Sequence, residues 1–154
     1  MLNIFRTNSI FEKNNMPVIT KSFSVKTRGD TDIIDITDQV TLSLSESELK
    51  NGTLTVFIPG STAGITTTEF EPGLLKDLPT LFEKLVPKTS HYNHDLTWGD
   101  GNGFSHLRAA LVKSFFTVPF VDGKMILGTW QQIILIDFDN RRRNREIVVQ
   151  IMGE

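Results

Sequence analysis

The chain has 154 residues, the usual size of one domain, and its 39% hydrophobic and 22% charged content is typical of a globular protein. Its 16 Lys and Arg against 18 Asp and Glu leave a net charge of −2, so it lacks the broad positive field of proteins that bind nucleic acids or anionic membranes. The absence of cysteine excludes disulfides, thiolate nucleophiles and cysteine-ligated metal sites.

The first 17 residues form a polar extension with weak periodicity, and we expect a single domain over residues 18–154. The start lacks an apolar run of signal-peptide length. The longest aliphatic run covers only residues 133–136, whereas a membrane-spanning helix needs about 20 apolar residues. These features predict a cytoplasmic protein with neither a membrane nor a nucleic acid as partner.

Segments rich in β-branched and aromatic residues, separated by turn signals, predict about eight strands. Their expected ranges, in chain order, are 18–27, 33–36, 53–59, 63–70, 114–120, 124–129, 131–139 and 145–152. Gly29-Asp30 and Asp122-Gly123 are turn signals, so we expect most strands to be joined as hairpins, beginning with a hairpin of the first two. Hairpin connections make the paired strands antiparallel.

Three helices are expected between these strands. Residues 38–51 fit either a strand or a helix, and a candidate N-cap at Asp38 favours the helix. Residues 72–85 carry an apolar stripe at helical spacing, which Pro79 should kink or divide.

The third expected helix covers residues 105–112 and is capped by Ser105. It follows residues 87–104, the longest stretch without periodicity, and a loop of this length in a small domain is usually functional or disordered. The whole pattern predicts an α+β fold with largely antiparallel sheets and about three helices.

The three histidines of the chain, His91, His94 and His106, lie within or beside this loop, together with Asp95 and Asp100. Imidazole and carboxylate are the ligands expected of a metal site without cysteine. His-x-x-His on a loop is not a defined zinc signature, so solvent-facing or hydrogen-bonded histidines remain the alternative.

Two further segments could bind an anion. Gly101, Asn102 and Gly103 end a glycine-rich stretch that runs into the expected helix, whose N-terminal amides attract phosphates, although such a stretch taken alone is more often a flexible loop. Strand alternation puts Arg143 and Arg145 on one side, where they could jointly bind a phosphate or carboxylate or simply be solvated.

Glu69 is a lone carboxylate at the end of a threonine-rich strand. A carboxylate at such a strand end can serve as a metal ligand or general base, or can simply begin the next turn. The sequence pattern alone leaves these alternatives open.

Several of these residues, taken together and in order, are similar to the YjbQ-like family, whose members are often labelled secondary thiamine-phosphate synthases. The resemblance runs from about Val18 to the C-terminus and is carried by Thr62-Ala63, residues 66–69, Tyr92-x-His94-Asp95, Ser105-His106-Leu107, Leu127-Gly128-x-Trp130-Gln131 and Arg143-x-Arg145. The chain departs from the family pattern at Gly60-Ser61, where many members have His-Thr, and at Val112-Lys113, where a glycine is common.

The resemblance implies a homotrimeric α+β protein with a site made from the shared polar residues. It assigns catalytic roles to Glu69, Asp95 and His106, and a divalent metal, zinc or magnesium, to His94 and His106. Within it, Arg143, Arg145 and the glycine-rich loop are expected to bind a small phosphorylated metabolite.

The implied activity joins a pyrimidine-methyl diphosphate to a thiazole phosphate and releases pyrophosphate. Such a reaction requires neutralisation of the leaving diphosphate and close positioning of the two substrates. Two alternatives remain at this point: a trimeric protein that binds a metal or phosphorylated metabolite without this activity, and metal-assisted hydrolysis of a phosphoester at the same histidines.

Overall fold

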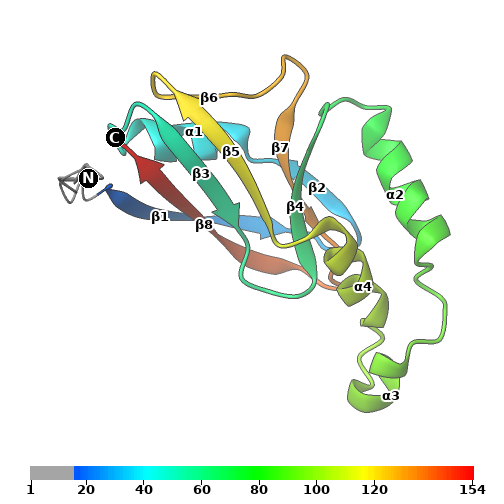
Figure 1. The fold of residues 1–154 in the computed structure, drawn as a ribbon. Coiled ribbons are helices and arrows are strands. Elements are labelled where there is room, and N and C mark those ends of the chain that lie inside the picture. The colour runs from blue at the N-terminus through cyan, green and yellow to red at the C-terminus, as the bar shows by residue number, and fades with distance from the viewer. Residues whose placement is uncertain (1–15) are drawn as a thin grey trace, which may run out of the picture.

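The computed structural model describes residues 16–154, which form eight strands and four helices, in agreement with the predicted α+β fold. The strands make two antiparallel sheets (Figure 1). In spatial order, the five-stranded sheet consists of β1 (Val18–Thr27), β8 (Arg143–Gly153), β3 (Gly52–Phe57), β5 (Phe115–Val121) and β6 (Lys124–Met125). The three-stranded sheet consists of β2 (Asp32–Asp35), β7 (Gln132–Asp137) and β4 (Ala63–Thr68).

The main core lies between the two sheets and is closed by α1 (Thr37–Ser45). Strand β7 is buried on both faces: Ile133 and Leu135 belong to this core, whereas Ile134 and Ile136 face a second one. The second core packs the outer face of the three-stranded sheet against α2 (Leu74–Leu85) and α4 (Gly103–Val112). Within residues 16–154 no helix is both long and apolar enough to cross a membrane.

Most of the expected hairpins are wrong. Only β5 and β6 pair directly with the neighbour in sequence, through the turn at Asp122-Gly123. Strand β1 instead pairs with β8, and β2 pairs with β7 in the other sheet. Gly29, Asp30 and Thr31 all have positive φ, and the Asp30 amide donates to the Asp139 carbonyl, so the chain crosses between sheets instead of folding back.

The helices differ from expectation mainly at their ends. α1 stops at Ser45, and its N-cap position is Ile36 rather than Asp38. α2 continues through Pro79 without division. Ser105 lies inside α4, two residues after its start, so it is not the N-cap.

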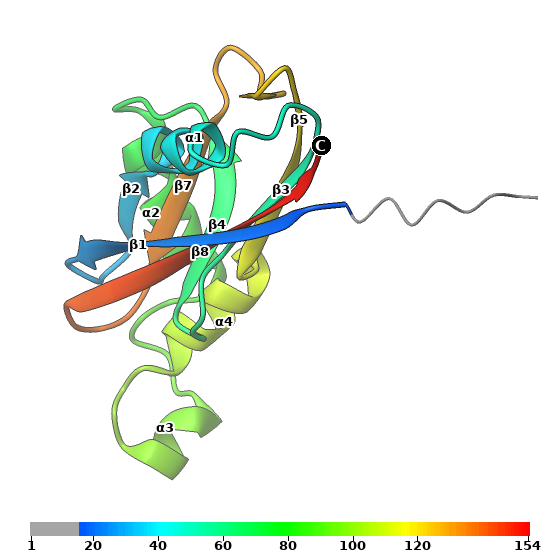
Figure 2. The same cartoon turned by 90° about the vertical axis from the view of Figure 1, so that its left-hand side faces the viewer.

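The expected long loop contains a helix, α3 (Asn93–Trp98), which projects beyond the sheets below α4 (Figure 2). Six residues are too few to show a helical period in the sequence. Gly99 ends α3 in the left-handed conformation, with φ of 65°, as glycine commonly does after a helix. The polar segment therefore has a defined shape, and it brings α3 beside the start of α4.

Candidate functional site

The junction of α3 and α4 brings two histidines together although twelve positions separate them in the chain. The ring centroids of His94 on α3 and His106 on α4 lie 4.3 Å apart, with an interplanar angle of 36°. Gly103 permits this approach, because a Cβ there would lie 2.6 Å from the Tyr92 Cβ. His91 is exposed and does not belong to the cluster.

Two carboxylates complete the group around His94. Its Nδ1 lies 3.6 Å from Asp95 Oδ1 and 3.6 Å from Asp100 Oδ1. This Nδ1 is buried and has no hydrogen-bond partner among the described residues. Of the residues in 16–154, only His94, Asp95 and Asp100 form a group of three whose donor atoms lie close enough for one metal ion, all within 4.8 Å of one another.

The same carboxylates occupy the amides of the glycine-rich loop. Asp95 Oδ1 accepts a hydrogen bond from the Gly103 amide at 2.9 Å, and Asp100 Oδ1 accepts one from the Asn102 amide at 3.2 Å. Asn102 is buried, and its Oδ1 also accepts a bond from the Asn140 amide. The start of α4 is therefore already capped by negative groups, and of the three predicted anion-binding residues only Gly101 is exposed.

Burial lowers the pKa of His106, and the adjacent His94 lowers it further, against the opposing effects of Asp100, Asp139 and Asp95. A pKa below the ordinary value of about 6.5 keeps the imidazole neutral near pH 7. A neutral imidazole can accept a proton or bind a metal. His106 also lines a cavity of about 340 Å³, together with Gly60 and Ser61 before β4 and Ala63 at its start.

Arg143 and Arg145 lie on one side of β8, as strand alternation predicts, but both are paired with buried carboxylates. Arg145 donates to both oxygens of Asp137, at 2.8 and 2.7 Å, and Arg143 donates to Asp139 at 2.8 Å. Thr62 donates to Asp139 and accepts from Arg145. The positive charges of Arg143 and Arg145, which were predicted to bind a phosphate, are therefore largely compensated by Asp139 and Asp137.

Glu69 lies apart from the histidines. It is exposed and follows the last residue of β4, whereas Ala63, at the other end of that strand, lines the cavity with His106. The six residue steps from Ala63 to Glu69 correspond to about 20 Å of extended strand. Within one chain, the structure does not bring Glu69 to the His94–His106 pair.

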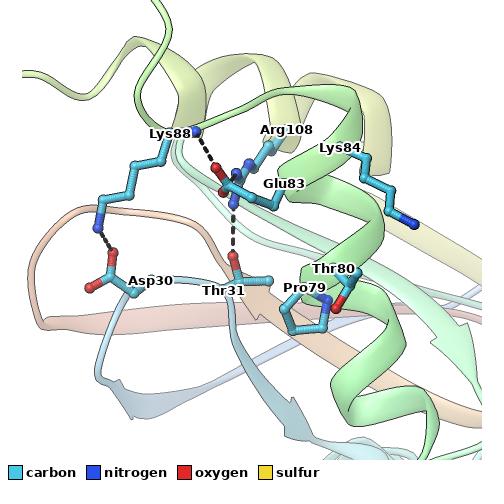
Figure 3. A pocket seen from close by; sticks show the side chains of 8 residues that line it. All are labelled: Asp30, Thr31, Pro79, Thr80, Glu83, Lys84, Lys88 and Arg108. Atoms are coloured by element: carbon cyan, nitrogen blue, oxygen red, sulfur yellow. Dashed lines mark hydrogen bonds and ion pairs between the residues drawn. The ribbon is translucent and has the colours of Figure 1, made fainter.

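A larger cavity of about 520 Å³ lies elsewhere, between α2 and the connection from β1 to β2 (Figure 3). Its central group, Arg108, is 3% exposed and donates to the Val86 carbonyl, to Thr31 and to Glu83. The hydrogen bond from Arg108 lowers the pKa of Glu83, and the Lys88 amide adds to this effect. Because these groups satisfy one another, they serve to hold α2 and α4 to the sheet connection.

Asp100 lies in the sequence next to the predicted metal-binding histidines but was assigned no role, and Asp137 and Asp139 were not predicted as site residues. Asp137 and Asp139 alternate at the end of the apolar strand β7, and a carboxylate pair emerging from a buried strand is a signal that can be read from sequence. Nothing in the sequence shows that their partners are the arginines of β8.

Comparison with known proteins agrees with the resemblance found in the sequence. The profile of the family described as "UPF0047 protein YjbQ-like" matches residues 21–154. The chain belongs to this family. A UPF0047 protein of Methanothermobacter thermautotrophicus is 40% identical over 139 residues, covering 90% of this chain and 95% of the relative. The UPF0047 protein YugU of Bacillus subtilis is 33% identical over 135 residues, covering 86% and 98%.

Solved structures of YjbQ-like proteins share the fold. A YbjQ-like protein of unknown function from Sulfolobus solfataricus has a TM-score of 0.86 and 35% identity, covering 90% of this chain and 99% of that one. An uncharacterized protein of the yjbq/upf0047 family from Clostridium acetobutylicum has a TM-score of 0.78 and 36% identity, covering 85% and 98%. The family assignment and the α+β fold that were predicted from the sequence are therefore confirmed.

Proposed function

We propose that His94, Asp95 and Asp100 bind a divalent cation, zinc or magnesium, beside a neutral His106. The observation that carries this proposal is the buried Nδ1 of His94, which has no hydrogen-bond partner and lies 3.6 Å from each of two carboxylate oxygens. A nitrogen with two carboxylate oxygens is a ligand set that suits such cations. Asp100 takes the position expected for Glu69, and the His106 ring lies beside the His94 ring, with their centroids 4.3 Å apart.

The reaction proposed for this centre is a transfer of the thiamine phosphate synthase type on a small phosphorylated metabolite. When bound, the cation would neutralise the negative charge of a leaving diphosphate. His106, neutral and facing the cavity, would accept or return a proton. Asp95 links the two helices through the Gly103 amide and so holds His94 in place beside His106.

A second candidate is a protein that binds a metal or a phosphorylated metabolite without this transfer, or that hydrolyses a phosphoester. The pairing of Arg143 and Arg145 with Asp139 and Asp137 favours it, because little uncompensated positive charge remains for a diphosphate. Formation of the product from both substrates separates transfer from hydrolysis, which needs no thiazole partner.

The metal is tested first, by mass spectrometry of purified protein and by zinc titration. Wild type should hold about one ion per chain, and His94→Ala and Asp100→Asn should lose it. His91→Ala is the matched control, since this histidine is exposed and outside the cluster. A metal-free wild type that also fails to bind added zinc or magnesium would contradict the proposed centre.

The reaction is tested by following thiamine phosphate formation from the pyrimidine-methyl diphosphate and the thiazole phosphate. A true synthase should saturate at micromolar to millimolar substrate, the range typical of enzymes. His106→Ala should reduce the rate strongly, whereas Lys26→Ala, an exposed residue remote from the histidines, should not. Equal rates in the two variants would remove His106 from the reaction.

We also propose that the protein is a homotrimer, as the family resemblance implies. Its support in this chain is a set of leucines on α2 and α4 that are about half exposed or more: Leu81, Leu85, Leu107 and Leu111. Light scattering after gel filtration should give three times the chain mass of 17.4 kDa. The mass of a single chain would contradict the trimer.

A further inference from the structure

The cavity beside His106 is lined by small residues and by polar residues whose side chains have no partner in the described part of the chain. Its eight lining residues are Gly60, Ser61, Ala63, His106, Ala109, Ala110, Lys113 and Ser114. Four polar side chains of this lining form no hydrogen bond or ion pair with any other group of residues 16–154. They are the His106 ring, the Lys113 ammonium and the hydroxyls of Ser61 and Ser114. The cavity lining thus includes four residues whose side chains can donate a hydrogen bond: His106 and Ser114, which are partly buried, and Ser61 and Lys113, which are exposed.

Lys113 occupies a backbone conformation that normally requires glycine. Its φ of 77° and ψ of 161° lie in a region that residues with a Cβ rarely adopt. The conformation is held in place, because the Lys113 amide donates to the Ala109 carbonyl at 2.8 Å and its carbonyl accepts from the Ile65 amide at 3.0 Å. Strained non-glycine residues of this kind are concentrated at ligand sites.

The cavity is open at the edge formed by Gly60, and Arg145 lies next to that edge. Gly60, with φ of 147°, leaves space at its edge, and a Cβ there would lie 3.5 Å from Nη1 of Arg145. The nearest buried carboxylates, Asp137 and Asp139, are already paired with Arg145 and Arg143. Lys113 therefore contributes a positive charge that no described carboxylate compensates.

We propose that this cavity is a subsite for the phosphate group of a small phosphorylated metabolite, and that Lys113 determines its specificity. A tetrahedral phosphate accepts hydrogen bonds from several directions, which suits an ammonium, two hydroxyls and an imidazole around one space. A volume of about 340 Å³ is sufficient for a small ligand but not for a macromolecule. The proposal extends the proposed function, because His106 belongs to both the subsite and the candidate centre.

The test is an NMR titration of the full-length protein with inorganic phosphate in the presence of a chelator, so that no metal contributes to binding. Wild type should bind with shifts in the backbone signals of Ser61, His106 and Lys113. Lys113→Met should weaken binding about tenfold or more, the usual effect of losing a hydrogen bond to a charged group. Lys76→Met, an exposed lysine on α2 outside the cavity, is the matched control and should bind as wild type does.

Ala110→Leu tests the space instead of the charge, since Ala110 is exposed on α4 and lines the cavity. It should also weaken phosphate binding, and acetate should bind wild type more weakly than phosphate does. Unchanged phosphate affinity in both Lys113→Met and Ala110→Leu, no binding by wild type, or equal binding of acetate would overturn the subsite. Failure of zinc to bind wild type while phosphate binding depends on Lys113 would overturn the metal proposal alone.

Discussion

Replacing Arg145 with methionine is expected to destabilise the fold itself. The Arg145 side chain is 10% exposed and donates from Nε and Nη2 to the two oxygens of Asp137, which is fully buried. Removing one member of a buried ion pair leaves an uncompensated charge and typically costs 3–5 kcal/mol of the free energy of unfolding. Asp137 would retain hydrogen bonds from the Thr27 hydroxyl and the Asp139 amide, so we expect a loss at the lower end, about 3 kcal/mol.

The assay is urea denaturation followed by far-ultraviolet circular dichroism, together with a thermal melt. For a chain of this length, a loss of about 3 kcal/mol lowers the melting temperature by roughly 6–12 °C. Arg142→Met is the matched control, because Arg142 is exposed and forms no ion pair within residues 16–154, and it should change stability by less than about 0.5 kcal/mol.

Equal stability of Arg145→Met and Arg142→Met would refute the reasoning. It would mean that Asp137 is neutral or hydrated, and that the Arg145 guanidinium is available to a ligand. A double variant, Asp137→Asn with Arg145→Met, should be less destabilised than the sum of its single changes, since no lone charge remains.

Three further predictions concern stability. Burial raises the pKa of Asp139, but hydrogen bonds from Arg143 and Thr62 outweigh it and leave the folded-state pKa below the ordinary value. This pKa difference stabilises the folded protein above the unfolded-state pKa of about 3.9, and the stabilisation is lost as pH falls through the folded-state pKa. The melting temperature should therefore fall more steeply below about pH 4 in wild type than in Asp139→Asn. Parallel curves of melting temperature against pH for the two proteins would contradict this prediction. Lys113→Gly should raise the free energy of unfolding by about 1 kcal/mol by removing backbone strain, measured by urea denaturation, and a loss of stability would contradict this. Arg108→Met should lower it by about 2 kcal/mol, because the Val86 carbonyl and the Thr31 hydroxyl lose their donor. Exposed Lys84→Met should change it little, and similar values for the two variants would show that Arg108 does not hold α2.

The candidate site could be predicted from the sequence only in part. The loop composition and the resemblance both selected His94 and His106, which lie 4.3 Å apart. The 3.6 Å approach of Asp100 to His94 and the separation of Glu69 could not be predicted, because both depend on where α3 and β4 lie in space. The uncompensated positive charge of Lys113 could be recognised only from its backbone conformation and its neighbours in the structure.

Local patterns in the sequence determined which segments are strands and where the apolar stripe of α2 lies, because alternation and helical spacing express which side of each segment is buried. They also determined the family, through residues spread along the chain. Only the tertiary structure decided that β1 pairs with β8 and that most consecutive strands belong to different sheets. The reason is that these contacts join groups that are distant in the sequence, as the ion pair of Arg145 with Asp137 also does. The free energy of such contacts depends on how deeply the groups are buried in the folded protein.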